Sequence, residues 1–162
     1  MFLTEKELKE TFWKNYNYSK RAIRYEFESP IREGNADLLT VEVFQDKIQF
    51  NSFEFKLSDI KKVILQAKEN SRWVHKSWIV IPAEKEDLIK IRYLTYLKEL
   101  KYVGVIIVEE SGLWKMIYKP YFRKEPKLNR NETRHSQDHY NNKIDSCINA
   151  NVYEVSSVQF VY

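Results

Sequence analysis

Cysteine, glycine and proline are scarce in this chain of 162 residues, which contains one, three and four of them respectively. The single cysteine, Cys147, has no second cysteine to pair with, which fits a reducing compartment. No apolar run approaches the ~18 residues that a membrane span needs, and the N-terminus lacks the basic-then-apolar order of a signal peptide. We therefore expect a cytoplasmic protein with no membrane partner and a mostly regular backbone.

Several motifs of well-defined chemistry are also missing. The sequence has no glycine-rich phosphate loop, no pair of CxxC motifs and no GxSxG elbow. This argues against P-loop NTPases, zinc ribbons and serine hydrolases. His135, Asp138, His139 and Cys147 lie close together, but polar and charged residues surround them, so a polar loop explains them better than a zinc site. His75 is likewise better explained as a residue at the entry to a strand than as a catalyst.

Apolar and aromatic residues are abundant, at 43% and 15% of the chain, which is enough to bury the core of one domain. The net charge of +4 (27 − 23) is compatible with a polyanionic partner. Residues 119–146 supply most of it, with seven basic residues against four acidic ones. The basic residues singled out here as nucleic-acid contacts are Lys119, Arg123, Lys124, Lys127, Arg130 and Arg134. A solvated loop is the alternative explanation for this charge.

Local patterns predict an alternation of helices and strands. Thr4 and Glu7 form a capping box for a first helix that ends near Tyr18, with Leu3 and Leu8 as its hydrophobic staple. Ser58 is expected to cap a second helix. The predicted strands are 21–28, 36–44, 48–57, 76–82, 103–108 and 113–118, a third helix covers 87–102, and 152–162 is a further β-rich segment.

Short turns between the first three strands imply an antiparallel meander. The expected architecture is therefore α+β, with a mixed central sheet, an α-β-β-β-α-β core and flanking helices. Residues 1–118 would form the core, 119–146 a basic loop, and 147–162 a C-terminal strand that packs back on the same single domain.

Charged side chains gather at one end of this meander. Asp37 opens the second strand, Glu54 and Lys56 close the third, and Glu26 and Glu28 close the first. Clustered carboxylates are hard to keep ionised together unless a hard divalent cation such as Mg²⁺ or Mn²⁺ lies among them. Such a cation can activate water for attack on a phosphate. The alternative is an exposed ion pair between Glu54 and Lys56, which would contribute only ~0–1 kcal/mol to stability.

The pattern Glu26-Phe27, Asn35-Ala36-Asp37-Leu38-Leu39, Phe53-Glu54-Phe55-Lys56-Leu57 and Gln66-Ala67 resembles the PD-(D/E)XK nuclease superfamily, which has the restriction-endonuclease-like fold. The resemblance covers about a third of the chain, from Tyr25 to Pro82. Two positions depart from the family pattern: Ala36 stands in place of the usual proline, and Asn35 in place of a basic residue. Neither position is a metal ligand in the family.

The resemblance implies a role for each matching residue. Asp37, Glu54 and the backbone carbonyl of Phe55 would hold the metal, and Lys56 would be the catalytic lysine. Gln66 matches a glutamine on the second helix of many members, and Glu26 matches an upstream acid, for which Glu28 and Glu10 are the substitutes.

The predicted function is therefore a Mg²⁺- or Mn²⁺-dependent nuclease, with DNA expected as substrate rather than RNA, and with a homodimer as one way to cut two strands. Two alternatives stay open. One is a degenerate nuclease fold that binds nucleic acid or a protein without cleaving, and the other is a purely structural or inhibitory interaction protein.

Overall fold

Six strands form one mixed sheet within residues 1–128, the part of the chain that the computed structural model describes. They are β1 (Ala22–Arg32), β2 (Gly34–Phe44), β3 (Lys47–Phe55), β4 (Lys76–Pro82), β5 (Val103–Val108) and β6 (Trp114–Tyr118). Their spatial order is their order in the chain. The α+β class and the mixed sheet are thereby confirmed, and Met1–Lys127 form one compact unit. The β-rich segment 152–162 lies outside the described residues.

The direction of each strand follows from its connection to the next. A two-residue turn at Gln45 and Asp46, both with positive φ, joins β2 to β3, and the β1–β2 and β2–β3 pairs are antiparallel. Positive φ at both turn residues matches the right-handed twist of a hairpin. Helical crossovers join β3 to β4 and β4 to β5, and these pairs are parallel. The three-strand meander was therefore predicted correctly.

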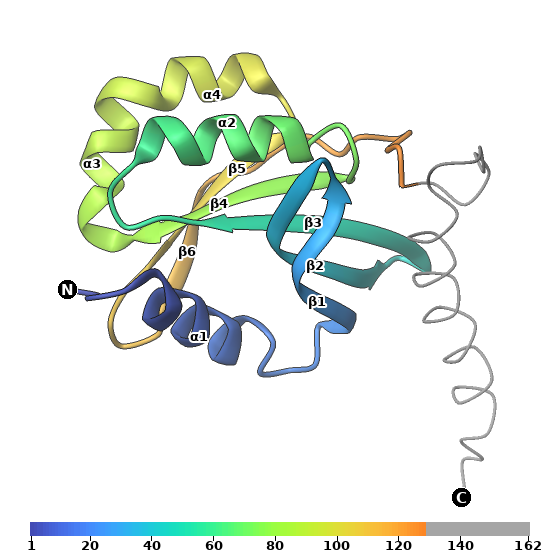
Figure 1. The fold of residues 1–162 in the computed structure, drawn as a ribbon, viewed down its shortest axis with the longest axis horizontal. Helices are drawn as coiled ribbons and strands as arrows, with labels where there is room; N and C mark the ends of the chain where they lie inside the picture. The colour runs from blue at the N-terminus through green and yellow to red at the C-terminus, as the bar shows by residue number, and fades with distance from the viewer. Residues whose placement is uncertain (129–162) are drawn as a thin grey trace, which may run out of the picture. The chain divides into compact units, whose positions relative to one another are not determined.

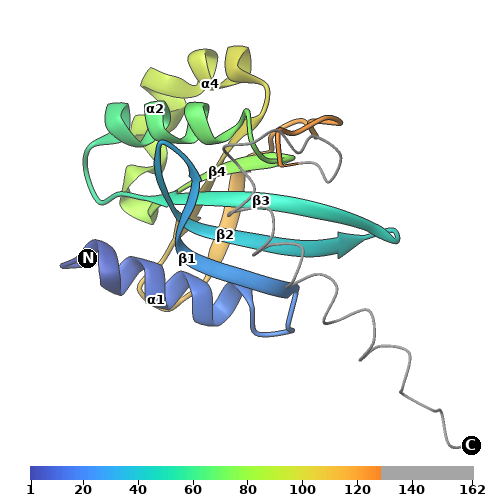
Figure 2. The same cartoon turned by 45° about the vertical axis from the view of Figure 1, so that its right-hand side comes forward.

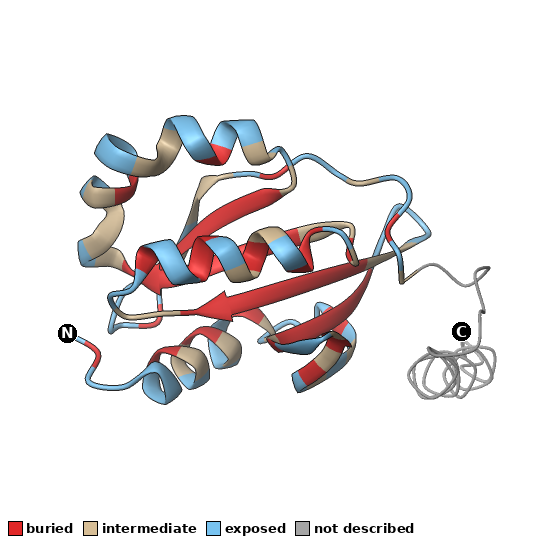
Figure 3. Ribbon diagram, turned by 45° about the horizontal axis from the view of Figure 1, so that its top comes forward, coloured by how far each residue is buried: buried red, intermediate tan, exposed pale blue. Residues whose placement is uncertain are grey.

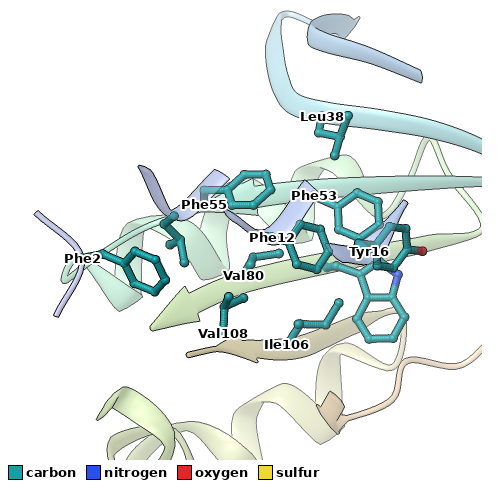
Figure 4. Close-up of a cluster of buried hydrophobic side chains, with 11 residues drawn as sticks. Phe2, Phe12, Tyr16, Leu38, Phe53, Phe55, Val80, Ile106 and Val108 are labelled. Carbon is teal, nitrogen blue, oxygen red and sulfur yellow. The ribbon is translucent and has the colours of Figure 1, made fainter. Parts of the chain in front are cut away.

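Helices cover both faces of the sheet (Figure 1). Helix α1 (Glu5–Tyr16) lies on one face, and α2 (Ile60–Asn70) and α4 (Leu94–Leu100) lie on the other. Each face has its own apolar core, and the central strands β3, β4 and β5 between them are mostly buried (Figure 3). The α1 core contains the aromatic rings of Phe12, Phe53 and Phe55 (Figure 4). In the described part of the chain, no helix has the length and apolar character that a bilayer crossing requires.

The start of α1 confirms the predicted cap but corrects the staple. Thr4 accepts a hydrogen bond from the backbone N–H of Glu7 at 3.1 Å, and Glu7 accepts one from the N–H of Leu3 at 2.9 Å. Leu3 itself is 83% exposed, whereas Phe2 is buried in the α1 core. The larger ring of Phe2 takes the apolar contact that we had assigned to Leu3.

Two further boundaries differ from the prediction. Asp59, not Ser58, caps α2, because its carboxylate accepts from the N–H of Lys62 at 3.0 Å. The expected helix over 87–102 begins earlier, as η1 (Ala83–Lys85) and α3 (Glu86–Leu88), and it contains a π-helical turn, η2 (Ile89–Tyr93). A π turn inserts an extra residue and rotates the helix that follows it. Leu97 is consequently buried, while Tyr96 is 39% exposed.

Strand β1 continues through Ser29 and Pro30, past the predicted end of this strand at residue 28. The strand tolerates proline because β1 is paired on one side only among the described strands. Glu28 has a φ of 51°, and the register with β2 shifts between Ser29 and Arg32. The β1–β2 hairpin is therefore bent, and its tip reaches the C-terminal end of α2 (Figures 1 and 2).

Candidate active site

Asp37 and Glu54 lie side by side on neighbouring strands. Leu38 of β2 pairs with Phe53 of β3, so the next residue pair along this antiparallel ladder is Asp37 and Glu54. Asp37 Oδ2 also accepts a hydrogen bond of 2.7 Å from the backbone N–H of Phe55. The two carboxylates are thus brought together at the end of β3, as the sequence predicted.

Glu54 is buried with only half of its carboxylate satisfied. Its side chain is 1% exposed, and Oε1 accepts a hydrogen bond of 2.6 Å from the amide of Asn70. Oε2 has no hydrogen-bond partner among the described residues. Burial, followed by the charge of Asp37, raises the pKa of Glu54 to about 7, while Asn70, Arg32 and Lys56 act in the opposite direction. A buried acceptor without a donor is costly, and it is a natural place for a cation.

Asp37 has a mixed electrostatic environment. Burial raises its pKa above the ordinary value, and the N–H of Phe55 opposes this shift. Lys9 and Lys56 also stabilise its charged form, whereas Glu28 destabilises it. Two lysines and a second acid therefore act on the same carboxylate.

Lys56 is held as an ammonium ion by Glu5 of α1. The Lys56 Nζ lies 2.7 Å from Glu5 Oε2, and the lysine side chain is only 16% exposed. Burial alone would lower the pKa of Lys56, but the hydrogen bond to Glu5 and the charges of Asp37 and Glu54 outweigh it, so the pKa is raised. A lysine with a raised pKa serves as a positive charge rather than as a base at neutral pH.

Lys9, one helical turn after Glu5, reaches the same region. Its Nζ forms an ion pair of 2.7 Å with Glu28 and lies 5.9 Å and 5.7 Å from the ring centroids of Phe27 and Phe55. Sequence reasoning missed both Glu5 and Lys9. Their spacing of four residues, which puts them on one helix face, was the available signal.

Asn70 and Arg32 were also missed. Asn70 was detectable in principle, because it continues the apolar stripe of α2 three residues after Ala67, and a polar residue at a buried position needs a partner. Its Oδ1 accepts a hydrogen bond of 2.6 Å from Arg32 Nε. No local pattern pointed to Arg32, because it reaches α2 only through the bend of the hairpin.

The remaining predicted site residues are placed as follows. Gln66 lies one turn before Asn70 on α2, with a buried Oε1 that has no partner among the described residues. Glu26 accepts from the hydroxyl of Ser29 at 2.9 Å, and Glu10 forms an exposed ion pair with Lys6. The metal role of the Phe55 carbonyl stays a prediction.

The first part of the basic segment packs at the other end of the parallel strands. Arg123 Nε donates to the carbonyl of Ser71 at 2.6 Å, and its guanidinium lies 3.9 Å from the ring centroid of Tyr102. Lys127 lies over Trp73. These contacts surround the start of β4, whereas the carboxylates lie at the end of β3. Contact between Lys119, Arg123, Lys124 or Lys127 and nucleic acid stays a prediction, and Arg130 and Arg134 lie outside the described residues.

His75 has a structural role, as expected. Its Nδ1 accepts a hydrogen bond of 2.9 Å from the N–H of Phe50, and its ring stacks on those of Phe50 and Phe122. Burial, and then the charge of Lys76, lowers the pKa of His75 to about 4. The residues of the zinc alternative, His135, Asp138, His139 and Cys147, lie outside the described residues.

Within residues 1–128, no group of three or more His, Cys, Asp or Glu side chains forms a ready metal cage. The residues at the end of β3 nevertheless fit a hard cation, because Glu54 presents a bare buried oxygen beside a second carboxylate. Comparisons with protein-family models, with curated proteins and with solved structures return no significant match. Any function must therefore be argued from this geometry.

Proposed function

We propose that the chain is a metal-dependent nuclease with the restriction-endonuclease-like fold and that Asp37, Glu54 and Lys56 form its active site. The observation that carries the proposal is the pairing of a bare buried carboxylate oxygen on Glu54 with a lysine held as a cation nearby. The bare oxygen of Glu54 does not benefit a domain that only needs to be stable, because burying an unsatisfied carboxylate costs free energy.

The metal would be Mg²⁺ or Mn²⁺, held by Asp37, Glu54 and the backbone carbonyl of Phe55. When bound, it would activate water and offset the charge that builds up on the phosphate. Lys56 contributes a fixed positive charge to the same phosphate, because Glu5 keeps it protonated and limits its movement. The raised pKa argues against Lys56 as the group that deprotonates water.

Other residues would support these three. Gln66 offers a buried amide oxygen that accepts no hydrogen bond from the described residues, which suits a bound water molecule. Glu26 on β1 is the candidate upstream acid, with Glu28 as its substitute. Glu28 forms an ion pair with Lys9. DNA is the proposed polymer, and a homodimer would place two such sites on two strands.

The test compares the wild-type protein with Lys56→Ala on labelled single- and double-stranded DNA and RNA, with Mn²⁺, Mg²⁺ or EDTA. We expect metal-dependent cleavage that falls at least about 100-fold in Lys56→Ala, the usual loss when a charge-stabilising group is removed. Lys61→Ala is the matched control, because Lys61 is exposed on α2. Cleavage that survives in Lys56→Ala would assign the activity to another site or a contaminant. Folded protein that cleaves nothing would favour the non-cleaving binding protein.

A further inference from the structure

We infer that Arg32 is a positioning residue for Glu54, acting through Asn70, and that together they leave one oxygen of Glu54 available to a metal ion. The inference rests on the proposed metal site. It assigns a purpose to the bent β1–β2 hairpin, whose tip carries Arg32 from a distant part of the chain to the buried end of α2.

The contacts form a chain from the hairpin to the carboxylate. Arg32 Nε donates to Asn70 Oδ1 at 2.6 Å, and this bond sets which way the amide faces. Asn70 must then present its Nδ2, which donates to Glu54 Oε1 at 2.6 Å. Arg32 Nη2 lies 3.9 Å from the same Oε1. Every described contact therefore falls on Oε1, and Oε2 stays bare.

Each of the three guanidinium nitrogens of Arg32 faces a partner. Nη1 donates to the carbonyl of Glu33 at 3.1 Å, which ties the fork to its own hairpin, while Nε and Nη2 face Asn70 and Glu54. A lysine has the same charge but no planar fork, so it cannot make these contacts together. The arrangement depends on geometry as well as on charge.

Positioning and simple electrostatics predict opposite effects on metal binding. A positive charge beside Glu54 repels a divalent cation, so removing the charge of Arg32 would tighten binding if charge were its whole contribution. If Arg32 instead orients Glu54 through Asn70, its removal loosens the ligand and weakens binding. The sign of the change separates the two explanations.

The experiment titrates Mn²⁺ alone into the full chain by calorimetry and by the EPR signal of free Mn²⁺. We expect Arg32→Gln and Asn70→Ala each to weaken Mn²⁺ binding about tenfold or more, the usual effect of removing a hydrogen bond that orients a metal ligand. Because Arg32 acts through Asn70, the double variant should bind no more weakly than Asn70→Ala alone. Arg72→Gln is the matched control, since Arg72 is an exposed arginine near the same end of α2 whose ion pair is with Glu69.

Arg32→Lys keeps the charge and serves where Arg32→Gln does not fold, as judged by circular dichroism. We expect this variant also to lose about tenfold in affinity. Unchanged or tighter binding in Arg32→Lys or Arg32→Gln would overturn the inference, and so would additive losses in the double variant.

The outcomes also separate this inference from the nuclease proposal. Weakened Mn²⁺ binding in a protein that cleaves no nucleic acid would support the positioning role and reject the nuclease. An active nuclease whose Mn²⁺ affinity is the same in all variants would support the nuclease proposal and reject the positioning role of Arg32. Wild-type protein that binds no Mn²⁺ would overturn both.

Discussion

Glu54 is buried, and the described side chains satisfy only one of its two carboxylate oxygens. Its pKa of about 7 in the folded protein lies above the ordinary value of 4.5, so the folded state holds the proton more tightly than the unfolded state. The stabilising contribution of Glu54 is therefore fully present below pH 4.5 and is lost as the pH rises through 7. Above neutrality, a metal ion would have to replace the proton as the positive partner.

This leads to a prediction for Glu54→Gln without metal. At pH 8 the variant should have a free energy of unfolding that is higher by about 1–3 kcal/mol, because a neutral amide replaces a buried charge. Urea denaturation measures the difference, which should shrink toward pH 4.5. Mn²⁺ should stabilise the wild type and leave the variant unchanged. Glu10→Gln, on an exposed face of α1, is the control, and a less stable Glu54→Gln at pH 8 would contradict the argument.

At the scale of elements, the β1–β2 hairpin has two register shifts, and it carries Arg32, which donates a hydrogen bond to Asn70. Gly34 at its tip has a φ of +109°, and a Cβ there would lie 2.6 Å from Arg32 Nη1. Glycine adopts this conformation freely, and other residues do not. The hairpin therefore needs Gly34 both for its turn and for the placement of Arg32.

Gly34→Ala is expected to lower stability by about 1–3 kcal/mol through backbone strain and to weaken Mn²⁺ binding by displacing Arg32. Gly112→Ala provides the matched comparison, because Gly112 has a φ of +89° in the turn before β6 and its added Cβ would meet Asn15 instead. Thermal unfolding should show losses in both variants, whereas Mn²⁺ titration should show a loss only in Gly34→Ala. Equal Mn²⁺ affinities in Gly34→Ala and Gly112→Ala would mean that the hairpin tip does not influence the metal site.

At the scale of the whole molecule, two groups toward opposite ends of the parallel strands respond to pH with opposite signs. His75, near the start of β4, has a pKa of about 4 in the folded state against an ordinary 6.5. The unfolded state therefore binds more protons in this range, and stability falls as the pH drops from 6.5 toward 4. Glu54, near the end of β3, gains stability over much of the same range.

Replacing His75 should therefore change the acid behaviour of the whole domain. His75→Asn keeps an acceptor for the N–H of Phe50 but does not titrate. We expect its melting temperature, measured without metal, to fall less than that of the wild type between pH 6.5 and pH 4.5. Glu54→Gln should show a steeper fall than the wild type. Parallel curves for the three proteins would mean that neither group controls acid stability.

The sequence alone was sufficient to predict the sheet meander and the side-by-side position of Asp37 and Glu54, whereas Lys56 follows the end of β3 and pairs with Glu5 of α1. Both follow from local rules: alternating side chains define the faces of a strand, and short turns place the end of one strand beside the start of the next. The cap at Thr4 is local in the same sense. The errors at Ser58 and Leu3 arose where the adjacent residue, Asp59 or Phe2, was equally suited to the role.

Only the tertiary structure decided which side chains support these three residues. Glu5 is 51 residues from Lys56, and Arg32 is 38 residues from Asn70, so no spacing in the sequence relates them. Their contacts depend on where α1 packs and on how far the hairpin bends, and both are set by long-range apolar burial. The sequence motif consists of residues on one meander. The side chains that form ion pairs and hydrogen bonds with these residues belong to other elements, which come close only in the folded protein.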